Sequence, residues 1–233
     1  MRMHDNTLYV TTQRAYLAHE GTNVKVRVGG ETRLRLPVHT VGNIVCFGNV
    51  SCSPFLMGMC GREGVGISFL SESGRFLARV QGPQSGNVLL RRAQHRATSD
   101  ARMAAGVARI LISAKVANCR TVLQRAVRDH GDRLEVQAAK AIEAAVDRLG
   151  SLLGDLQQPL GLDRVRGIEG EAAAIYFGQF DRLIVAQKEA FFFRERSRRP
   201  PTDNVNALLS FFYAVLTNDL ASACESVGRS TTV

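Results

Sequence analysis

A glutamate within the segment Asp163–Phe177 is the residue whose type and surroundings point most directly to chemistry. If this segment is a helix with about 100° between residues, Glu169 falls on the same side as Val165 and Tyr176. Glu171 falls about 200° away, on the opposite side. We therefore predict that Glu169 faces inward on an apolar surface and that Glu171 faces solvent.

An inward carboxylate loses its hydration, which destabilises the fold unless a partner compensates the charge. One possible partner is Arg166 or an arginine from another helix, in a structural ion pair. The other is a hard divalent cation such as Mg²⁺ or Mn²⁺, which takes carboxylate oxygens as ligands. In a phosphate-binding protein that ion would polarise the scissile phosphate. One glutamate cannot hold a catalytic ion alone, so other helices would have to supply further ligands.

Two arginine-rich clusters favour a polyanionic partner. The chain has 30 Lys and Arg against 21 Asp and Glu, a net charge of +9, and guanidinium groups match phosphate oxygens well. The candidate DNA-binding residues are Arg91, Arg92 and Arg96 in the first cluster and Arg194, Arg196, Arg198 and Arg199 in the second. Because aromatic residues are scarce near both clusters, we expect contact with a duplex backbone rather than base stacking. The alternative is that both clusters are solvated faces without a partner.

Cysteine usage and hydropathy bear on the compartment. The five cysteines are an odd number and form no Cys-x-x-Cys pair, which argues against a disulfide framework and a structural zinc site. No run of 18 or more apolar residues is present, so we expect no membrane partner. These features predict a cytoplasmic protein with reduced thiols.

The periodicity of the chain changes after a turn-rich junction at residues 81–86. Before it, short alternating runs predict strands, with Gly29-Gly30 as a hairpin turn and one short helix beginning at Ser53-Pro54. After it the apolar period is 3.6, which predicts helices. We therefore predict an α+β fold, with a β-sandwich-like domain at residues 1–86 and an all-α domain at residues 87–233.

Two of the helices are clear in the second region. Ile142, Leu149 and Leu152 mark an amphipathic helix that ends near Gly154, and a final helix starts near Asp203 and runs towards Gly228.

The stretch Gly167-Ile168-Glu169-Gly170-x-Ala172-Ala173-x-x-Tyr176-Phe177 resembles the metal-site motif of the CRISPR adaptation integrases, the Cas-one family. Other stretches resemble the subtype I-C branch of that family, and together they cover nearly the whole chain. These stretches are Leu8–Thr12, Ser68–Glu72 with Gly74–Ala78, Gly86–Gln94, and Arg198–Asp203 with Val205–Phe211.

The resemblance implies an N-terminal β-domain that mediates homodimerisation and a C-terminal all-α catalytic domain. It implies that short foreign DNA is inserted into a CRISPR array when a 3′-hydroxyl attacks a phosphodiester with the help of Mg²⁺ or Mn²⁺. Double-stranded DNA and a small companion adaptation protein, Cas-two, are the implied partners. Glu169 is the implied catalytic residue and metal ligand, with Tyr176 and Asn206 in supporting roles.

The chain also departs from the family pattern. The family's other two metal ligands, a histidine and an aspartate, follow the helix that starts near Asp203, whereas here no histidine follows His130. We therefore expect a C-terminally truncated, incomplete catalytic domain. Two functions stay open: an integrase and endonuclease that uses Glu169, or a catalytically incomplete DNA-binding and assembly subunit. A basic structural protein without a nucleic-acid role is a third, weaker alternative.

Overall fold

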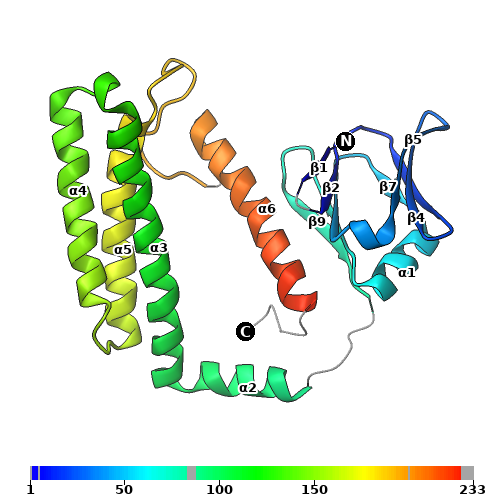
Figure 1. Ribbon diagram of the computed structural model, residues 1–233, viewed down its shortest axis with the longest axis horizontal. Coiled ribbons are helices and arrows are strands. Elements are labelled where there is room, and N and C mark those ends of the chain that lie inside the picture. The colour runs from blue at the N-terminus through cyan, green and yellow to red at the C-terminus, as the bar shows by residue number, and fades with distance from the viewer. Residues whose placement is uncertain (1, 5, 83–87, 199, 227–233) are drawn as a thin grey trace. The chain divides into compact units, whose positions relative to one another are not determined.

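The computed structural model describes residues 2–4, 6–82, 88–198 and 200–226, and Figure 1 labels its helices and strands. The chain forms two compact units: residues up to Arg92 with those from Ser210 onward, and Ala93–Leu209 between them. The predicted division at residue 86 cuts the chain once, whereas here the last helix from Ser210 onward belongs to the β-rich unit. The predicted junction lies largely outside the described residues. The α+β fold itself is confirmed.

A five-stranded sheet with the order β1-β2-β6-β8-β9 forms one layer of the first unit. Its strands are β1 (Arg2–His4), β2 (Thr7–Val10), β6 (Asn43–Phe47), β8 (Gly66–Leu70) and β9 (Phe76–Val80). β2, β6 and β8 run parallel, and β1 and β9 pair antiparallel at the edges. The apolar residues of β6 are all buried, and such a run lacks the alternation that made the other strands predictable.

The second layer is a four-stranded sheet with the order β5-β4-β3-β7. Its strands are β3 (Tyr16–Glu20), β4 (Asn23–Val28), β5 (Glu31–Pro37) and β7 (Ser51–Cys52). Gly29 and Gly30, with φ of 60° and 87°, form the turn between β4 and β5, so the predicted hairpin is confirmed. A 3₁₀ turn, Val38–Thr40, follows β5.

One apolar core joins the two sheets and helix α1 (Pro54–Glu63). Leu8 and Ile67 of the first sheet, Leu17 of the second and Leu56 of α1 are all fully buried in it. The predicted start of α1 is confirmed, since Ser53 Oγ accepts a hydrogen bond from Leu56 N at 3.2 Å. The arrangement is the predicted β-sandwich-like domain.

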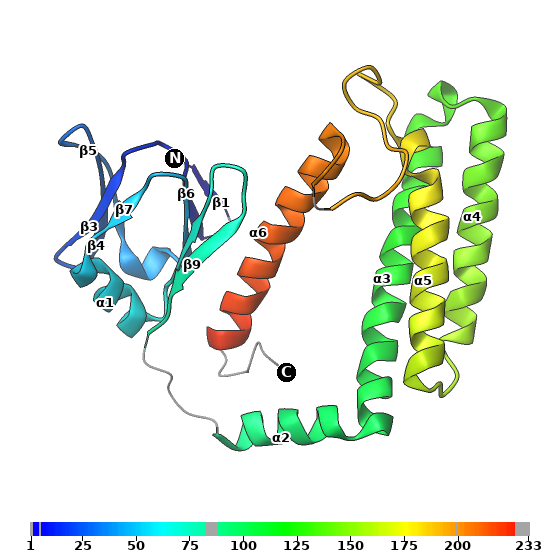
Figure 2. The same cartoon turned by 180° about the vertical axis from the view of Figure 1, so that it is seen from behind.

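The second unit is a bundle of α3 (Ala101–His130), α4 (Val136–Asp155) and α5 (Leu162–Gln179), which lie side by side in both views (Figures 1 and 2). Helix α2 (Val88–Ser99) precedes them. The 3₁₀ turns Gly131–Arg133 and Phe180–Leu183 follow α3 and α5. Leu149 and Leu152 of α4 are fully buried in the bundle core, as its apolar spacing predicted. Nowhere in the described part of the chain does a helix combine the length and apolarity that crossing a membrane requires.

The last helix, α6 (Asn204–Ser226), confirms the prediction of a helix from about residue 203. From Ser210 onward the helix packs on the five-stranded sheet, where the rings of Phe211 and Phe47 stack with centroids 5.8 Å apart. Further along, Asn218 Oδ1 accepts a hydrogen bond from Ser68 Oγ at 2.9 Å. Its first turns belong to the other unit.

Candidate functional site

Helix α5 holds Glu169 at the edge of its buried face rather than within it. Val165, Ile168 and Ala172 form the buried stripe of the helix. The side chains of Glu169 and Glu171 are each 40% exposed, so the predicted inward position of Glu169 and its contrast with Glu171 are wrong. Because α5 packs against both α3 and α4, its buried stripe points between those two helices. One glutamate is therefore left on each side of the stripe.

The partner of Glu169 is a lysine from another helix. Lys115 Nζ, on α3, donates to Glu169 Oε1 at 2.7 Å. Of the two kinds of partner considered for Glu169, the structure thus shows an ion pair, with lysine in place of arginine. Arg166 instead bonds Asp163, one turn earlier on the same helix, at 3.2 Å. Lys115 and Glu169 are 54 residues apart, so no local pattern could have paired them.

The acid on the other side of the stripe has a matching partner. Arg148 Nε, on α4, donates to Glu171 Oε1 at 2.7 Å. Two glutamates of equal exposure therefore each bridge α5 to one neighbouring helix. The geometry by itself does not distinguish Glu169 as the catalytic one.

The donor set around Glu169 does not make a divalent-metal site. Across the described residues, no three His, Cys, Asp or Glu side chains come together in a way that could hold a metal ion. The group bonded to the Glu169 carboxylate is the ammonium of Lys115, and its positive charge repels a metal cation instead of helping to bind it. Mg²⁺ and Mn²⁺ need several oxygen ligands. The described residues therefore do not supply a complete set of ligands for the implied ion.

Tyr176 belongs to an aromatic cluster at the end of α5. Its ring packs edge-on against Phe177 and Phe180, with centroids 5.3 and 5.6 Å away. Phe193, which is 4% exposed, completes the cluster from the segment that follows α5, 5.0 Å from Phe180. Tyr176 thus packs in the cluster that anchors this segment to the bundle.

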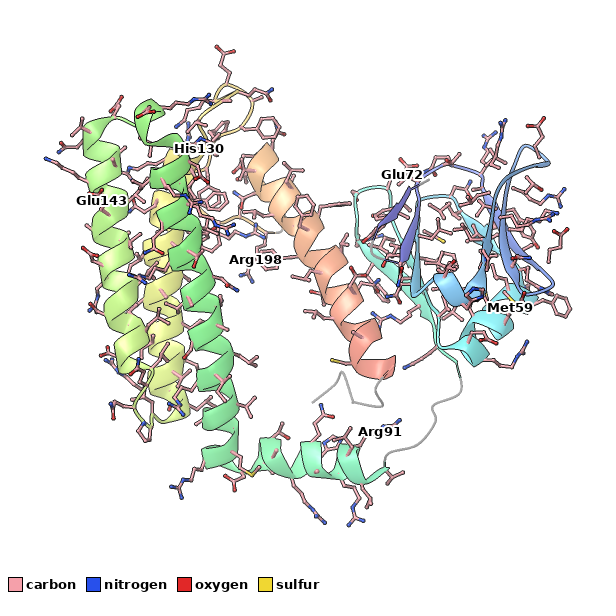
Figure 3. The ribbon with its side chains drawn as sticks, in the orientation of Figure 1. Met59, Glu72, Arg91, His130, Glu143 and Arg198 are labelled. Atoms are coloured by element: carbon pink, nitrogen blue, oxygen red, sulfur yellow. The ribbon has the colours of Figure 1, made fainter. Side chains whose placement is uncertain are left out.

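The second arginine cluster lies on the segment between α5 and α6, where Figure 3 labels Arg198. Arg194 and Arg198 are exposed. Arg196 is half-buried and donates through Nη1 to Asn206 Oδ1 at 2.8 Å and to its neighbour's carbonyl, Ser197 O, at 2.5 Å. Arg199 lies outside the described residues.

Aromatic residues immediately precede this arginine cluster, contrary to the expectation that they are scarce near it. Phe192 is 37% exposed, and the Arg194 guanidinium lies 5.5 Å from the centre of its ring. That distance is within the range of a cation–π contact. An exposed ring therefore stands beside one of the candidate phosphate contacts.

Asn206 is fully buried at the start of α6 and ties the arginine segment to that helix. Its backbone N donates to Asp203 Oδ1 at 2.7 Å, so Asp203 caps α6. The Asn206 side chain bonds Arg196 and the backbone of the same segment. Asn206 thus links the segment to α6, and its supporting role in catalysis stays a prediction.

The first arginine cluster lies on α2, and further arginines follow it on α3. On α2, Arg92 and Arg96 are exposed and Arg91 is half-buried. On α3, Arg109 donates to the carbonyl oxygens of Leu156 and Gln157 at 3.0 and 2.9 Å, and so satisfies the end of α4. Arg120 Nε likewise donates to Val146 O at 3.2 Å. Arg109 and Arg120 are therefore engaged in hydrogen bonds within the fold, so fewer arginines of this stretch are open to a partner than the sequence suggests.

Comparison with known proteins decides the family. The sequence model of the family described as "CRISPR associated protein Cas1" matches residues 8–232. The chain belongs to the Cas1 family. The family that the Glu169 segment indicated is thereby confirmed.

Among relatives, a Cas1 chain of Chlorobaculum tepidum, named "CRISPR-associated endonuclease Cas1 1", is 46% identical over 228 residues, which are 98% of this chain and 66% of that one. "CRISPR-associated endonuclease Cas1 2" of Rhodospirillum rubrum is 47% identical over 224 residues, 96% of this chain and 64% of its own. This chain therefore spans a little under two thirds of the length of these Cas1 relatives.

Solved structures share the fold. A Cas1 protein from Thermotoga maritima has a TM-score of 0.70 at 21% identity, over 94% of this chain and 65% of that one. A casposase bound to integration product has a TM-score of 0.75 at 19% identity, over 97% of this chain and 63% of that one. A "Cas6-RT-Cas1--Cas2 complex" also has a TM-score of 0.75 at 19% identity, over 99% of this chain and 24% of that one. The β-sheet unit followed by helices is therefore the Cas1 architecture.

Proposed function

We propose that this Cas1 chain acts in CRISPR adaptation as a DNA endonuclease and integrase, with Glu169 as its catalytic carboxylate. The observation that carries the proposal is the position of Glu169 at the bundle surface, 40% exposed, within the Gly-Ile-Glu-Gly segment that resembles the family's metal-site motif. A phosphodiester can reach a carboxylate so placed. Support comes from the relatives named endonucleases and from the fold shared with a casposase bound to an integration product.

Mg²⁺ or Mn²⁺ is the ion that the resemblance implies for this chemistry. Glu169 is the ligand that the resemblance assigns to it, and its carboxylate is bonded to Lys115. The described residues bring no three His, Cys, Asp or Glu side chains together to complete the site. We therefore assign no step to the ion. What the chain itself provides is a carboxylate on α5 that is hydrogen-bonded to one ammonium.

The same proposal extends to partners and to the compartment. We propose that the chain binds double-stranded DNA in the cytoplasm through Arg92, Arg96 and the exposed Arg194 and Arg198, because a basic surface releases counterions when it contacts phosphates. We also propose a homodimer through the first unit, whose edge strand β9 exposes Phe76 and Leu77 by 49% and 51%. A small companion protein, such as the Cas2 of the solved Cas1–Cas2 complex, is the further partner.

A catalytically incomplete DNA-binding and assembly subunit is the second candidate. The Lys115–Glu169 pair favours it, because the candidate catalytic carboxylate already has a counter-ion. In this alternative the basic surface binds DNA and the first unit mediates assembly, but the chain does not cleave DNA.

Strand transfer of a short duplex in the presence of Mn²⁺ separates the two candidates. We expect Glu169→Ala to abolish transfer, whereas Glu171→Ala, which removes an equally exposed glutamate from the same helix, leaves most of it. Unchanged transfer by Glu169→Ala rejects the assigned role. Suppose instead that wild-type protein binds DNA with a steep salt dependence but shows no strand transfer with any divalent ion. The chain is then a DNA-binding and assembly subunit without catalytic activity.

A further inference from the structure

The side chain of Asn206 is fully buried and all of its hydrogen-bonding capacity is used. Its Oδ1 accepts from Arg196 Nη1 at 2.8 Å and from Ser197 N at 3.0 Å. Its Nδ2 donates to Glu195 O at 2.8 Å and to Asp203 Oδ2 at 2.7 Å. An amide offers two acceptor sites and two donors, so this side chain is saturated. Asn206 thus bonds three consecutive residues of the segment between α5 and α6, here called the loop, and also the cap of α6. These contacts hold the loop against the start of α6.

Arg196 is turned inward by this arrangement. Its Nη1 bonds both Asn206 Oδ1 and Ser197 O, which leaves the guanidinium half-buried against the loop's own backbone. Arg196 therefore links Asn206 to the backbone of its own segment, and its role as a DNA contact stays a prediction.

The arginines two positions to either side point the other way, since both Arg194 and Arg198 are exposed. The chain before Arg194 is anchored by Phe193, whose N donates to Asp181 Oδ1 at 2.8 Å. The chain around Arg198 is closed by Thr202 N, which donates to Ser197 Oγ at 3.0 Å. Two exposed guanidinium groups are thus displayed on a loop that is fixed at both ends and in the middle.

We infer that Asn206 is a positioning residue, which holds Arg196 inward and thereby presents Arg194 and Arg198 to the phosphates of a DNA duplex. The inference rests on the proposed DNA binding and deepens it. A loop that is already ordered loses less conformational entropy when it binds, so its arginines contribute more to affinity. Cutting the Asn206 contacts should therefore weaken DNA binding without removing any cation.

Trypsin cleavage tests, without DNA, whether Asn206 holds the loop in place. Asn206→Asp keeps the shape of the side chain but sets a carboxylate oxygen against Glu195 O and the Asp203 carboxylate, so the loop should loosen. We expect cleavage after Arg194, Arg196 or Arg198 to become several-fold faster. The matched control is Asn218→Asp, a buried amide on the same helix that bonds Ser68 and Arg79 in the first unit and should leave loop cleavage unchanged. Loop cleavage as slow in Asn206→Asp as in wild type overturns the inference.

A mutant cycle on DNA affinity tests the consequence. Arg194→Ala with Arg198→Ala should lower the log–log salt slope by roughly two, one for each lost phosphate contact. Asn206→Asp and Arg196→Met each also make the protein one charge more negative, which weakens binding in any background. Each should therefore cost several-fold more affinity in the wild-type background than in that double variant, where only the effect of the charge remains. Additive losses in the double variant would show instead that Arg196 is itself a phosphate contact or that the variant protein is damaged as a whole, and either result overturns the inference.

The two proposals fail in different ways. If wild-type protein does not bind a duplex, the proposed function falls and the role of Asn206 in DNA binding falls with it. If wild type binds but the losses are additive, only the inference fails. If Asn206→Asp does not fold, Arg196→Met decides the outcome alone. It removes the Arg196–Asn206 hydrogen bond and leaves the Asn206 contacts with Glu195, Ser197 and Asp203 in place.

Discussion

Lys115 Nζ on α3 and Glu169 Oε1 on α5 lie 2.7 Å apart and join the two helices at the surface of the bundle. Both side chains keep substantial exposure, 49% for the lysine and 40% for the glutamate. A pair in such contact with solvent is screened and stabilises the fold only weakly. Its importance therefore lies in bringing two opposite charges together, so that Glu169 offsets the positive charge of Lys115.

The first prediction concerns stability. Lys115→Met should lower the free energy of unfolding by no more than about 1 kcal/mol, since exposed ion pairs contribute about 0–1 kcal/mol. Arg148→Met, which breaks the equivalent pair with Glu171, should cost a similar amount. Urea unfolding measures both. A loss of several kcal/mol for Lys115→Met alone would mean that this pair is desolvated.

The second prediction concerns the charge of Lys115, which Glu169 neutralises. Glu169→Gln removes the partner and leaves the ammonium free, so metal-free affinity for a duplex should rise and the salt slope should increase by roughly one. Filter binding at several salt concentrations gives both quantities. Loss of negative charge alone would also raise affinity, so the control is Glu169→Gln in a Lys115→Met background. A rise of the same size in that background contradicts a role for the freed Lys115.

The third prediction concerns the docking of α6 on the five-stranded sheet. Gly74 has a φ of +85°, and a side chain there would run into the Phe211 ring. Gly74→Ala should cost roughly 2–5 kcal/mol, from backbone strain and from displacement of the ring. Gly21→Ala, at a φ of +59° with open space around it, should cost only the strain of about 1–2 kcal/mol. Equal losses in urea unfolding would show that Phe211 does not pack against Gly74.

The fourth prediction concerns pH. Burial raises the pKa of Asp219, and its Oδ1 is buried without a hydrogen-bond partner among the described residues. A carboxyl whose pKa is raised in the folded state destabilises that state once it is ionised. The penalty is therefore absent at low pH and develops as pH rises past the unfolded pKa, about 3.9. Asp219→Asn removes it.

Thermal melting of the Asp219 variant checks this sign. We expect Asp219→Asn to raise Tm at pH 7, and the gain to shrink as the pH approaches 4. Asp147→Asn, at an exposed position on α4, should not reproduce the trend. A Tm gain that grows on acidification would be the wrong sign for a raised pKa.

Features with a short-range cause were predictable from the sequence. The Gly29-Gly30 turn needs two positive φ values, and the start of α1 needs a hydroxyl before a proline, so both could be read from adjacent residues. The apolar face of α4 follows from its 3.6-residue period. The segment around Glu169 also identified the family, because its resemblance depends on residue order alone.

Only the tertiary structure decided how the candidate site is arranged. The helical arc of α5 gave the wrong environment for Glu169 because a helix packed against two neighbours buries one stripe and leaves its flanks exposed. Neither the Lys115–Glu169 pair nor the bond between Arg196 and Asn206 follows from the sequence, because each joins residues that neither periodicity nor a motif relates. Local spacing determines which element forms. The charge that a functional side chain meets is set by the other elements packed beside it.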